Sequence, residues 1–448
     1  MPAIVTQNLR NHNAEQFIEA LSETANSIFY VFIGKPYPWN NNTVELQKDS
    51  SDLIYKLYDE MVAVKKITAN DLELVIPRYD WVSGVVYNHY DNSSNTQFKL
   101  DITSKVLTSG IEQKEQQPFY VLADTVNFNV YKCIANSKGA PSVVKPTGTS
   151  VDVITTGDGY KWKYIYTIPV GKRSRFFNSD FMYVTNSNNS SNEDGALDFI
   201  RVTNGGSQYT SAPTVSITGD GTGATATAVL SGNVVSNVSI DTRGLNYRFA
   251  NVSFSGGSGS NAAATAIIGP KGGHAANAAL ELGGVFVMLA PELIDSENDN
   301  FPLDNDFRTL GILKDPLLYG TSSRAFGSSY STRKALYLSN VTGSFSLDEY
   351  ITGSTSYANA VVSSISVDTA NSKANVRYFQ AKDITLNSNA FANGEAVVGV
   401  TSGAIGNLIS VINEGIQPDT GQIIYVDTFV PIQRSSGQTE ILQLVIEF

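Results

Sequence analysis

Two internal repeats constrain the fold of this chain more than any other feature of its sequence. The first has a period of 38 residues and pairs Val202 to Tyr209 with Ile240 to Tyr247. Each copy continues with a short β-like run, Thr214 to Ile217 or Asn251 to Phe254, and then with a tract of glycine, alanine and threonine. Two copies are too few for a solenoid, and neither offers much apolar area. We therefore expect one small β module in which each copy packs against its sibling.

The second repeat has a period of 46 residues, and its two copies share five residues at matching offsets. These are Phe345, Glu349, Gly353, Ser356 and Ala358 in the first copy, and Phe391, Glu395, Gly399, Ser402 and Ala404 in the second. The character of the rest of the chain resumes between the repeats, from Glu281 to Tyr319, and after them, from Gly421 onward. Both repeat pairs are therefore interpreted as small β modules inserted into a core.

This interpretation divides the chain into five segments. They are the N-terminal part of the core with helices (1–196), the first module (197–276), a core segment (277–334), the second module (335–415) and a C-terminal core hairpin (416–448). Charged residues make up 16% of the chain, well below the roughly 25% of average soluble domains, and turn-forming residues are abundant. The predicted fold class is mainly β, a layered β-sandwich core with a few helices near the N-terminus.

The C-terminal segment reads as a strand paired with its upstream neighbour. Leu442, Leu444, Ile446 and Phe448 alternate with their neighbours at the two-residue period of a strand. The stretch from Gly421 to Glu440 supplies another strand and a polar turn. We expect a terminal hairpin that points Leu444, Ile446 and Phe448 inward.

Helix signals are confined to about the first 65 residues. Asn13 is expected to cap a helix with Phe17, Leu21 and Thr24 on one face, and Ser50 or Ser51 to cap a second helix. The apolar residues of that second helix are Leu53, Leu57, Tyr58 and Met61. Strands are expected at Ser27 to Ile33, Phe119 to Leu122, Asn129 to Ile134 and Trp162 to Ile168.

Composition argues against several classes of function. The formal net charge is −11, whereas nucleic-acid binding needs a basic surface that neutralises phosphates. The overall balance therefore argues against nucleic-acid binding and leaves only a local basic patch open. The single cysteine, Cys133, allows neither an internal disulfide nor a cysteine-based zinc site. No apolar run reaches the ~18 residues of a membrane helix, and the first residues do not read as a signal peptide. The expected protein is made in a cytoplasm and stays soluble or joins an assembly there.

Three groups of residues invite a chemical function, and each has a simpler interpretation. The tract Gly219 to Gly223 resembles a phosphate loop, but a strand-like run follows it and it lacks the lysine, so a β-turn is favoured. An acidic run could bind calcium, but it lacks the EF-hand spacing, so a solvated loop is favoured. Its residues are Asp295, Glu297, Asp299, Asp304 and Asp306.

The histidines and aromatic residues give no catalytic pattern either. His12, His89 and His274 lie far apart and show no metal-ligand spacing. A Ser-His-Asp arrangement that assembles only in the fold stays open. The three tryptophans, Trp39, Trp81 and Trp162, are interpreted as core or interface residues. We predict no catalytic residue, no cofactor and no metal ligand, and hence no enzyme.

Six segments, taken in their order along the chain, resemble a known family. They are NSIFYVFIGKPYPW (Asn26 to Trp39), VIPRYDW (Val75 to Trp81), VYKCI (Val130 to Ile134), GDGYKWKYIYTIP (Gly157 to Pro169), DFRTLGILKDPL (Asp306 to Leu317) and the final stretch from Gly421 to Phe448. Together they are similar to the baseplate wedge protein of T-even-like contractile-tailed bacteriophages, a β-sandwich subunit that forms dimers. The two repeat modules are additional to that family pattern.

The resemblance implies a structural protein of the virion, located in the tail baseplate and made in the host cytoplasm. It implies a homodimer that contacts other wedge subunits and fibre-bearing baseplate proteins, with no nucleic acid and no membrane insertion. The alternative is a receptor-binding or glycan-processing tail protein acting through the inserted modules. That alternative predicts a groove lined with aromatic residues and paired carboxylates.

Overall fold

A computed structural model of the chain describes residues 5–22, 27–37, 50–92, 118–186, 194–303, 306–380 and 389–448. Its secondary structure is 48% strand and 11% helix, which confirms the expectation of a mainly β chain with few helices. The chain divides into two compact units. Unit 1 holds Met1–Gln16, Glu73–Met288 and Val445–Phe448, and unit 2 holds Phe17–Leu72 and Leu289–Leu444. Each unit contains open sheets and one closed barrel.

Unit 1 contains two four-stranded sheets that carry much of its buried aromatic content. The first has the order β27 (Leu444–Glu447), β15 (Phe286–Leu289), β3 (Leu72–Pro77) and β8 (Phe181–Tyr183). The second has the order β4 (Tyr120–Leu122), β5 (Asn129–Asn136), β7 (Tyr160–Thr167) and β6 (Ile154–Thr155). Tyr87, Tyr131, Tyr160 and Trp162 form a buried cluster on the second sheet, with Cys133 among them. Cys133 is therefore the small core residue that its apolar surroundings in the sequence suggest.

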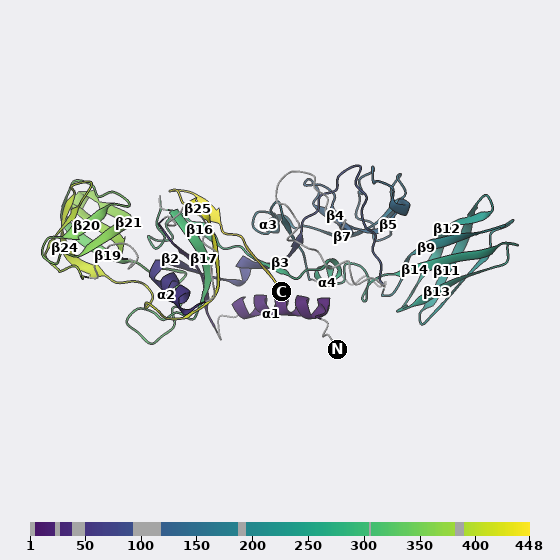
Figure 1. Cartoon of the computed structure of the whole chain (residues 1–448), viewed down its shortest axis with the longest axis horizontal. Coiled ribbons are helices and arrows are strands. Elements are labelled where there is room, and N and C mark those ends of the chain that lie inside the picture. The colour runs from purple at the N-terminus through teal and green to yellow at the C-terminus, as the bar shows by residue number, and fades with distance from the viewer. Residues whose placement is uncertain are drawn as a thin grey trace. The chain divides into compact units, whose positions relative to one another are not determined.

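The 38-residue repeat folds into a closed six-stranded barrel (Figure 1). Its first copy supplies β9 (Leu197–Ser207), β10 (Thr214–Gly219) and β11 (Thr222–Ser231). Its second copy supplies β12 (Val234–Leu245), β13 (Ala250–Ser255) and β14 (Ser260–Ile268). The strand order around the barrel is β10-β11-β12-β9-β14-β13. Most neighbouring strands therefore come from different copies, because β10–β11 and β13–β14 are the pairs that stay within one copy.

Unit 2 is built on a five-stranded antiparallel sheet with the order β18 (Ser329–Ser331), β2 (Met61–Lys66), β1 (Phe29–Gly34), β17 (Asp306–Lys314) and β25 (Gln422–Gln433). A separate two-stranded sheet joins β16 (Glu292–Ile294) to β26 (Thr439–Ile441). The central strand β1 is buried along its whole length, as its apolar sequence FYVFIG requires. Tyr30 and Phe32 from this strand pack with Leu313 of the neighbouring β17.

The 46-residue repeat forms the second closed barrel (Figure 1). Its strands are β19 (Lys334–Thr342), β20 (Tyr350–Gly353), β21 (Asn359–Asp368), β22 (Lys373–Phe379), β23 (Ala396–Gly399) and β24 (Ile405–Ile412). Their order is β19-β22-β21-β20-β23-β24. If the six strands of each barrel are numbered along the chain, both barrels have the same closed strand order, 1-4-3-2-5-6. Two repeats with different sequences have therefore adopted one topology.

The helices are short and few. They are α1 (Gln7–Ser22), α2 (Ser51–Glu60), α3 (Val170–Arg173) and α4 (Ala278–Leu282), with 3-10 turns at Ala69–Asp71, Ser137–Gly139 and Thr369–Asn371. The Oγ of Ser50 accepts the backbone N–H of Leu53, which confirms the predicted cap of α2. The predicted start of α1 at Asn13 is wrong. That helix begins at Gln7, where Thr6 Oγ1 accepts the N–H of Leu9 at 3.2 Å, and Thr24 lies outside the described residues.

The predicted C-terminal hairpin is also wrong, although the strand itself exists. β25 pairs with β17, whereas the last strand β27 lies beside β15 in another sheet. The short β26 takes the intervening residues to β16. Within the last strand Leu444 is buried, while Ile446 and Phe448 are half-buried. The polar turn between the strands therefore links separate sheets, because each strand pairs with a strand far away in the sequence.

Candidate functional site

A buried cluster of charged side chains lies at the base of the first barrel. Lys132 on β5 places its Nζ 2.9 Å from Glu281 Oε1 on α4. His274, in the loop between β14 and α4, places Nδ1 2.5 Å from Glu281 Oε1 and Nε2 2.6 Å from Asp198 Oδ2 on β9. Arg243 on β12 also pairs with Asp198. The cluster thus ties two strands of the barrel to a core strand and a core helix of unit 1.

Burial is nearly complete for four of these five side chains. The side chains of Lys132 and Asp198 are 0% exposed, and those of His274 and Glu281 are 2% and 3% exposed. Tyr90 covers the lysine, with Nζ 3.3 Å from its ring centroid. Lys132 and His274 therefore face the two carboxylates in a place that water does not reach, and the partly exposed Arg243 adds a third cation at its edge. Removing one partner of such a buried pair typically costs about 3–5 kcal/mol, because the remaining charge is left without compensation.

The electrostatics of the cluster favour its ionised form. Burial opposes ionisation of both carboxyls, but Lys132 and His274 hold the pKa of Glu281 well below its usual range. His274 and Arg243 likewise lower the pKa of Asp198. Burial works against the His274 imidazolium, yet the two facing carboxylates raise its pKa above the ordinary value. The pKa of Lys132 is lowered, because desolvation outweighs the attraction of Glu281.

This arrangement holds the protein together and leaves His274 unable to act as a general base. Each of its ring nitrogens lies within hydrogen-bonding distance of a carboxylate, and the carboxylates favour the imidazolium form, in which both nitrogens donate. A catalytic histidine needs one free nitrogen to accept a proton from a nucleophile. The Ser-His-Asp arrangement that the sequence left open therefore does not form at His274.

A second carboxylate system lies inside the second barrel and involves the residues shared by its two copies. Glu395 accepts the backbone N–H and the hydroxyl of Thr355 and of Ser356, at 2.7 to 3.0 Å. Glu349, its counterpart 46 residues earlier, accepts the N–H and hydroxyl of Ser402 at 2.9 and 2.8 Å. Each copy thus supplies the carboxylate that holds the turn of the other copy.

These hydrogen bonds lower the pKa of both glutamates. Burial opposes ionisation, but the combined donors reduce the pKa of Glu395 to about 2 and also lower that of Glu349. The shared glycines Gly353 and Gly399 lie against the carboxylates, where a Cβ atom would overlap them. The repeat positions found in the sequence are therefore the parts of a reciprocal clasp.

The first barrel uses tyrosine rings in the same reciprocal way. Tyr209 of the first copy packs against Gly259 of the second, and Tyr247 of the second copy packs against Gly221 of the first. A Cβ at either glycine would overlap the ring that lies on it. Both tyrosines are buried, at 3% and 5% exposure. The glycine tracts are therefore cradles for aromatic side chains, and Gly219 to Gly223 forms the turn from β10 to β11 followed by a strand, as the sequence favoured.

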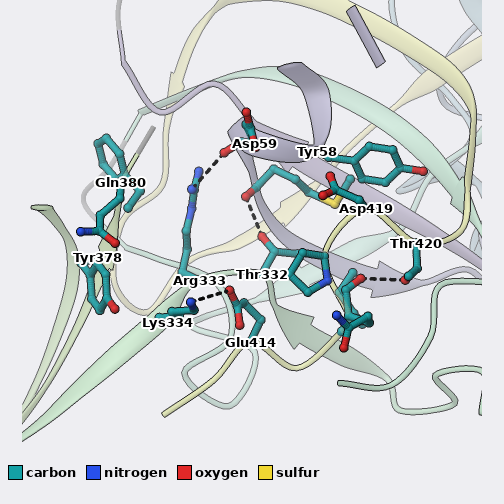
Figure 2. A pocket seen from close by; sticks show the side chains of 15 residues that line it. Tyr58, Asp59, Thr332, Arg333, Lys334, Tyr378, Gln380, Glu414, Asp419 and Thr420 are labelled. Atoms are coloured by element: carbon teal, nitrogen blue, oxygen red, sulfur yellow. Dashed lines mark hydrogen bonds and ion pairs between the residues drawn. The ribbon is translucent and has the colours of Figure 1, made fainter. Parts of the chain in front are cut away.

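Unit 2 contains a cavity of about 230 Å³ beside the start of the second barrel, and Figure 2 shows the side chains that line it. Arg333 crosses its wall and donates to the carbonyl oxygens of Asp59 at 3.2 Å and Glu60 at 3.0 Å, at the C-terminal end of α2. Burial lowers the pKa of Arg333 to about 10. Lys334 and Glu414, both in the lining of the cavity, pair at 3.8 Å. The cavity is smaller than the ≈ 300–1,000 Å³ of typical ligand sites, and the polar groups around it cap a helix and join the barrel to its sheet.

Three carboxylates of the acidic run bind other residues of the protein. Glu297 pairs with Lys65 at 2.5 Å, Asp306 pairs with Arg308 at 2.9 Å, and Asp295 accepts the N–H of Gly437 at 3.1 Å. Asp304 lies outside the described residues. Among the residues that the structure describes, no three His, Cys, Asp or Glu side chains gather in a way that could hold a metal ion. The same described part of the chain contains no helix long and apolar enough to cross a membrane.

Sequence reasoning missed the buried charge cluster. Its members are separated by up to 149 residues, so no spacing could reveal them. One signal was present, because Lys132 interrupts the otherwise apolar run from Val130 to Ile134. A lysine at the centre of a buried strand requires a buried counter-charge. The sequence could not say that Glu281 provides it.

Comparison with known proteins finds a distant, partial similarity to a phage protein. It is similar to the baseplate wedge protein gp8 of Enterobacteria phage T4, with 23% identity over 201 residues. The match covers 37% of this chain and 56% of the phage T4 protein, so the chain spans about half the length of the curated relative that it matches. No protein-family model matches the chain. The similarity to a baseplate wedge protein is therefore distant and partial.

Proposed function

We propose that the chain is a structural subunit of the baseplate wedge in a contractile phage tail. The observation that carries the proposal is its 23% identity over 201 residues with a protein of that name. In this role the chain resides in the virion and performs no catalysis. Its task is to hold neighbouring subunits at fixed positions during tail assembly and host attachment.

The use of buried polar groups supports a scaffold. Lys132 and His274 form ion pairs with Glu281 at the base of the first barrel. The carboxylates of Glu349 and Glu395 accept hydrogen bonds from turns of the second barrel. Reactive groups in active sites are instead poised to meet a substrate. These groups are committed to holding the fold.

The proposed partners are a second copy of the chain, other wedge subunits and the fibre-bearing baseplate proteins. The edge strand β25 supports extensive protein contact, because Ile424, Val430 and Ile432 are 39%, 68% and 40% exposed on it. Long edge strands with apolar side chains favour pairing with another chain. The core dimer predicted from the sequence is tested by light scattering of the purified chain at micromolar concentration. A monomer at that concentration, with no self-contact in an assembled baseplate, would contradict it.

Labelling of phage particles tests the function itself. An antibody against the chain should bind at the tip of isolated tails, and tails from phage lacking the gene should have no complete baseplate. Label along fibres, with complete baseplates in the deletion phage, would overturn the proposal. That outcome would favour the alternative of a receptor-binding or glycan-processing protein, which binding of the purified chain to host polysaccharide would then test.

A further inference from the structure

The outer wall of the second barrel carries an apolar patch formed by Tyr350, Val398, Val400 and Ile405, here called the outer patch. Val400 donates its N–H to the carbonyl of Tyr350 at 2.8 Å, and Val398 lies directly opposite Ile405 in the β23–β24 ladder. Residues directly opposite in adjacent strands point to the same face. Because the alternating residues Ile351, Val397 and Gly399 are buried inside the barrel, the outer patch faces solvent.

The repeat itself provides a comparison for this patch. At a period of 46 residues the counterparts of Tyr350, Val398, Val400 and Ile405 are Ala396, Thr352, Ser354 and Asn359. The five residues shared by the two copies, the clasp glutamates and glycines among them, are identical, yet the outer wall is apolar at one set of positions and small or polar at the other. The apolar outer residues are therefore not needed to form the barrel, because their counterparts form the same wall without them.

Exposure sets the size of the patch. Tyr350, Val400 and Ile405 are 44%, 61% and 42% exposed. Side chains of this size and exposure present on the order of 300 Å² of apolar surface, which is comparable to the largest patch on a typical monomer and is often functional. A stable interface needs about 800 Å² from each partner. The outer patch alone therefore suits a weak contact that high local concentration would populate.

We propose that the outer patch docks against the outer patch of a second copy of the chain. None of its four residues or their four counterparts is charged, whereas the whole chain carries a net charge of −11. Two copies repel one another over most of their surfaces, and contact at an uncharged patch avoids this repulsion. An apolar patch is also its own complement, as a two-fold contact requires. This contact is separate from the proposed core dimer and does not depend on the baseplate function.

Cysteine cross-linking of the full chain tests the contact. Val400→Cys places a thiol in the outer patch, and Val367→Cys places one at a comparably exposed valine of the same barrel, 54% exposed and outside the patch. The native Cys133 is fully buried and serves as an internal background. A short bis-maleimide should give covalent dimers of Val400→Cys that increase with protein concentration, and far fewer of Val367→Cys. Equal yields from the two variants would overturn the proposal.

Sedimentation velocity provides a second measurement with different substitutions. Val400→Glu should abolish the concentration-dependent rise in mass above the core dimer, whereas Val367→Glu should leave that rise unchanged. Both sites are exposed, and circular dichroism checks that both variants are folded. An unchanged rise in Val400→Glu would show that another surface mediates the contact. Loss of the core dimer in both variants would contradict the assignment of that dimer to a different face, and so would overturn the separation of the two contacts.

Discussion

Substitution of Glu395 by glutamine should open the second barrel without unfolding the rest of the chain. The carboxylate accepts bonds from Thr355, Ser356 and the N–H of Ala392, the last at 2.7 Å. Glutamine keeps the size of the side chain, but it replaces one acceptor oxygen with an N–H₂ group that faces donors. The variant therefore loses the charge-assisted bonds and gains a clash of donors.

The magnitude follows from the pKa of the carboxyl. In the folded protein the pKa of Glu395 is lowered from 4.5 to about 2. At about 1.4 kcal/mol for each unit, this difference corresponds to roughly 3 kcal/mol of stabilisation from the ionised carboxylate. Because the folded pKa is the lower one, the stabilisation is complete above about pH 4.5 and is lost as the pH falls toward about 2. The glutamine variant should lack that acid-dependent loss.

Hydrogen exchange measured by mass spectrometry at neutral pH checks this expectation. Peptides covering β20, β23 and the turn at Thr355 should exchange about 100-fold faster in Glu395→Gln, since 3 kcal/mol is about two factors of ten. Peptides from β1 and β17 should not change. Glu349→Gln should act in the same direction, because Glu349 holds the opposite turn.

Asp348→Asn supplies the matched control. Burial and the nearby Asp306 raise the pKa of Asp348, so its charge is unfavourable in the folded protein. Neutralising it should leave exchange in the barrel unchanged or slower. Equal acceleration in Asp348→Asn and Glu395→Gln, or less than a threefold change in Glu395→Gln, would refute the assignment of the clasp to these bonds.

Three further outcomes are expected. Deletion of Leu444 to Phe448 removes β27, the buried Leu444 and the bonds from Arg10 to Phe448 and Glu447. Burial of one such leucine contributes about 1.5–3 kcal/mol, so the truncated chain should melt several degrees lower or be insoluble. An unchanged melting temperature would contradict this. His274→Gln should remove the loss of stability that the native chain shows at alkaline pH. The raised pKa of His274 gives stabilisation that is complete below its ordinary value of 6.5 and is lost as the pH rises through the folded value. Melting temperatures recorded from neutral to alkaline pH should therefore decline in the native chain and stay level in the variant. Replacing Leu197 to Ala276 by a Gly/Ser linker should leave a folded chain. Replacing only Ile200 to Ala266 should leave a more stable one, because this shorter replacement keeps Asp198, His274 and the contacts of Phe199 and Ile267 with Tyr90 and Ile134. Equal melting temperatures of the two variants would show that the charge cluster contributes little.

The sequence predicted features that depend on local pattern. The 38- and 46-residue periods revealed the two modules, and apolar runs located β1, β4, β5 and β7 within one or two residues. The cap at Ser50 followed from the preference of serine for that position. In each case the deciding interaction lies within a few residues along the chain or is repeated at a fixed offset.

Features that depend on distant partners were missed. The terminal strand was predicted correctly, but its nearest neighbour in sequence was taken as its partner, whereas β15 lies beside it. The start of α1 was placed at Asn13, because the polar first turn of the helix carries no apolar period and Thr6 was not recognised as its cap. The common topology of the barrels was also hidden, since one is lined by tyrosines on glycines and the other by glutamates in turns. Different residues solved the same packing problem, and a comparison of the two repeats by residue identity could not detect this.

The crossed arrangement of the repeat copies has a consequence for the history of these barrels. Each copy closes the turns or cradles the rings of the other, and most strand neighbours belong to different copies. A gene that encoded one copy could have built such a barrel only by bringing two polypeptides together. Joining both copies in one chain makes that encounter intramolecular, so that closure does not depend on protein concentration. In the 46-residue repeat the two halves keep the five residues of the clasp and its surroundings identical, whereas the outer-patch residues differ from their counterparts.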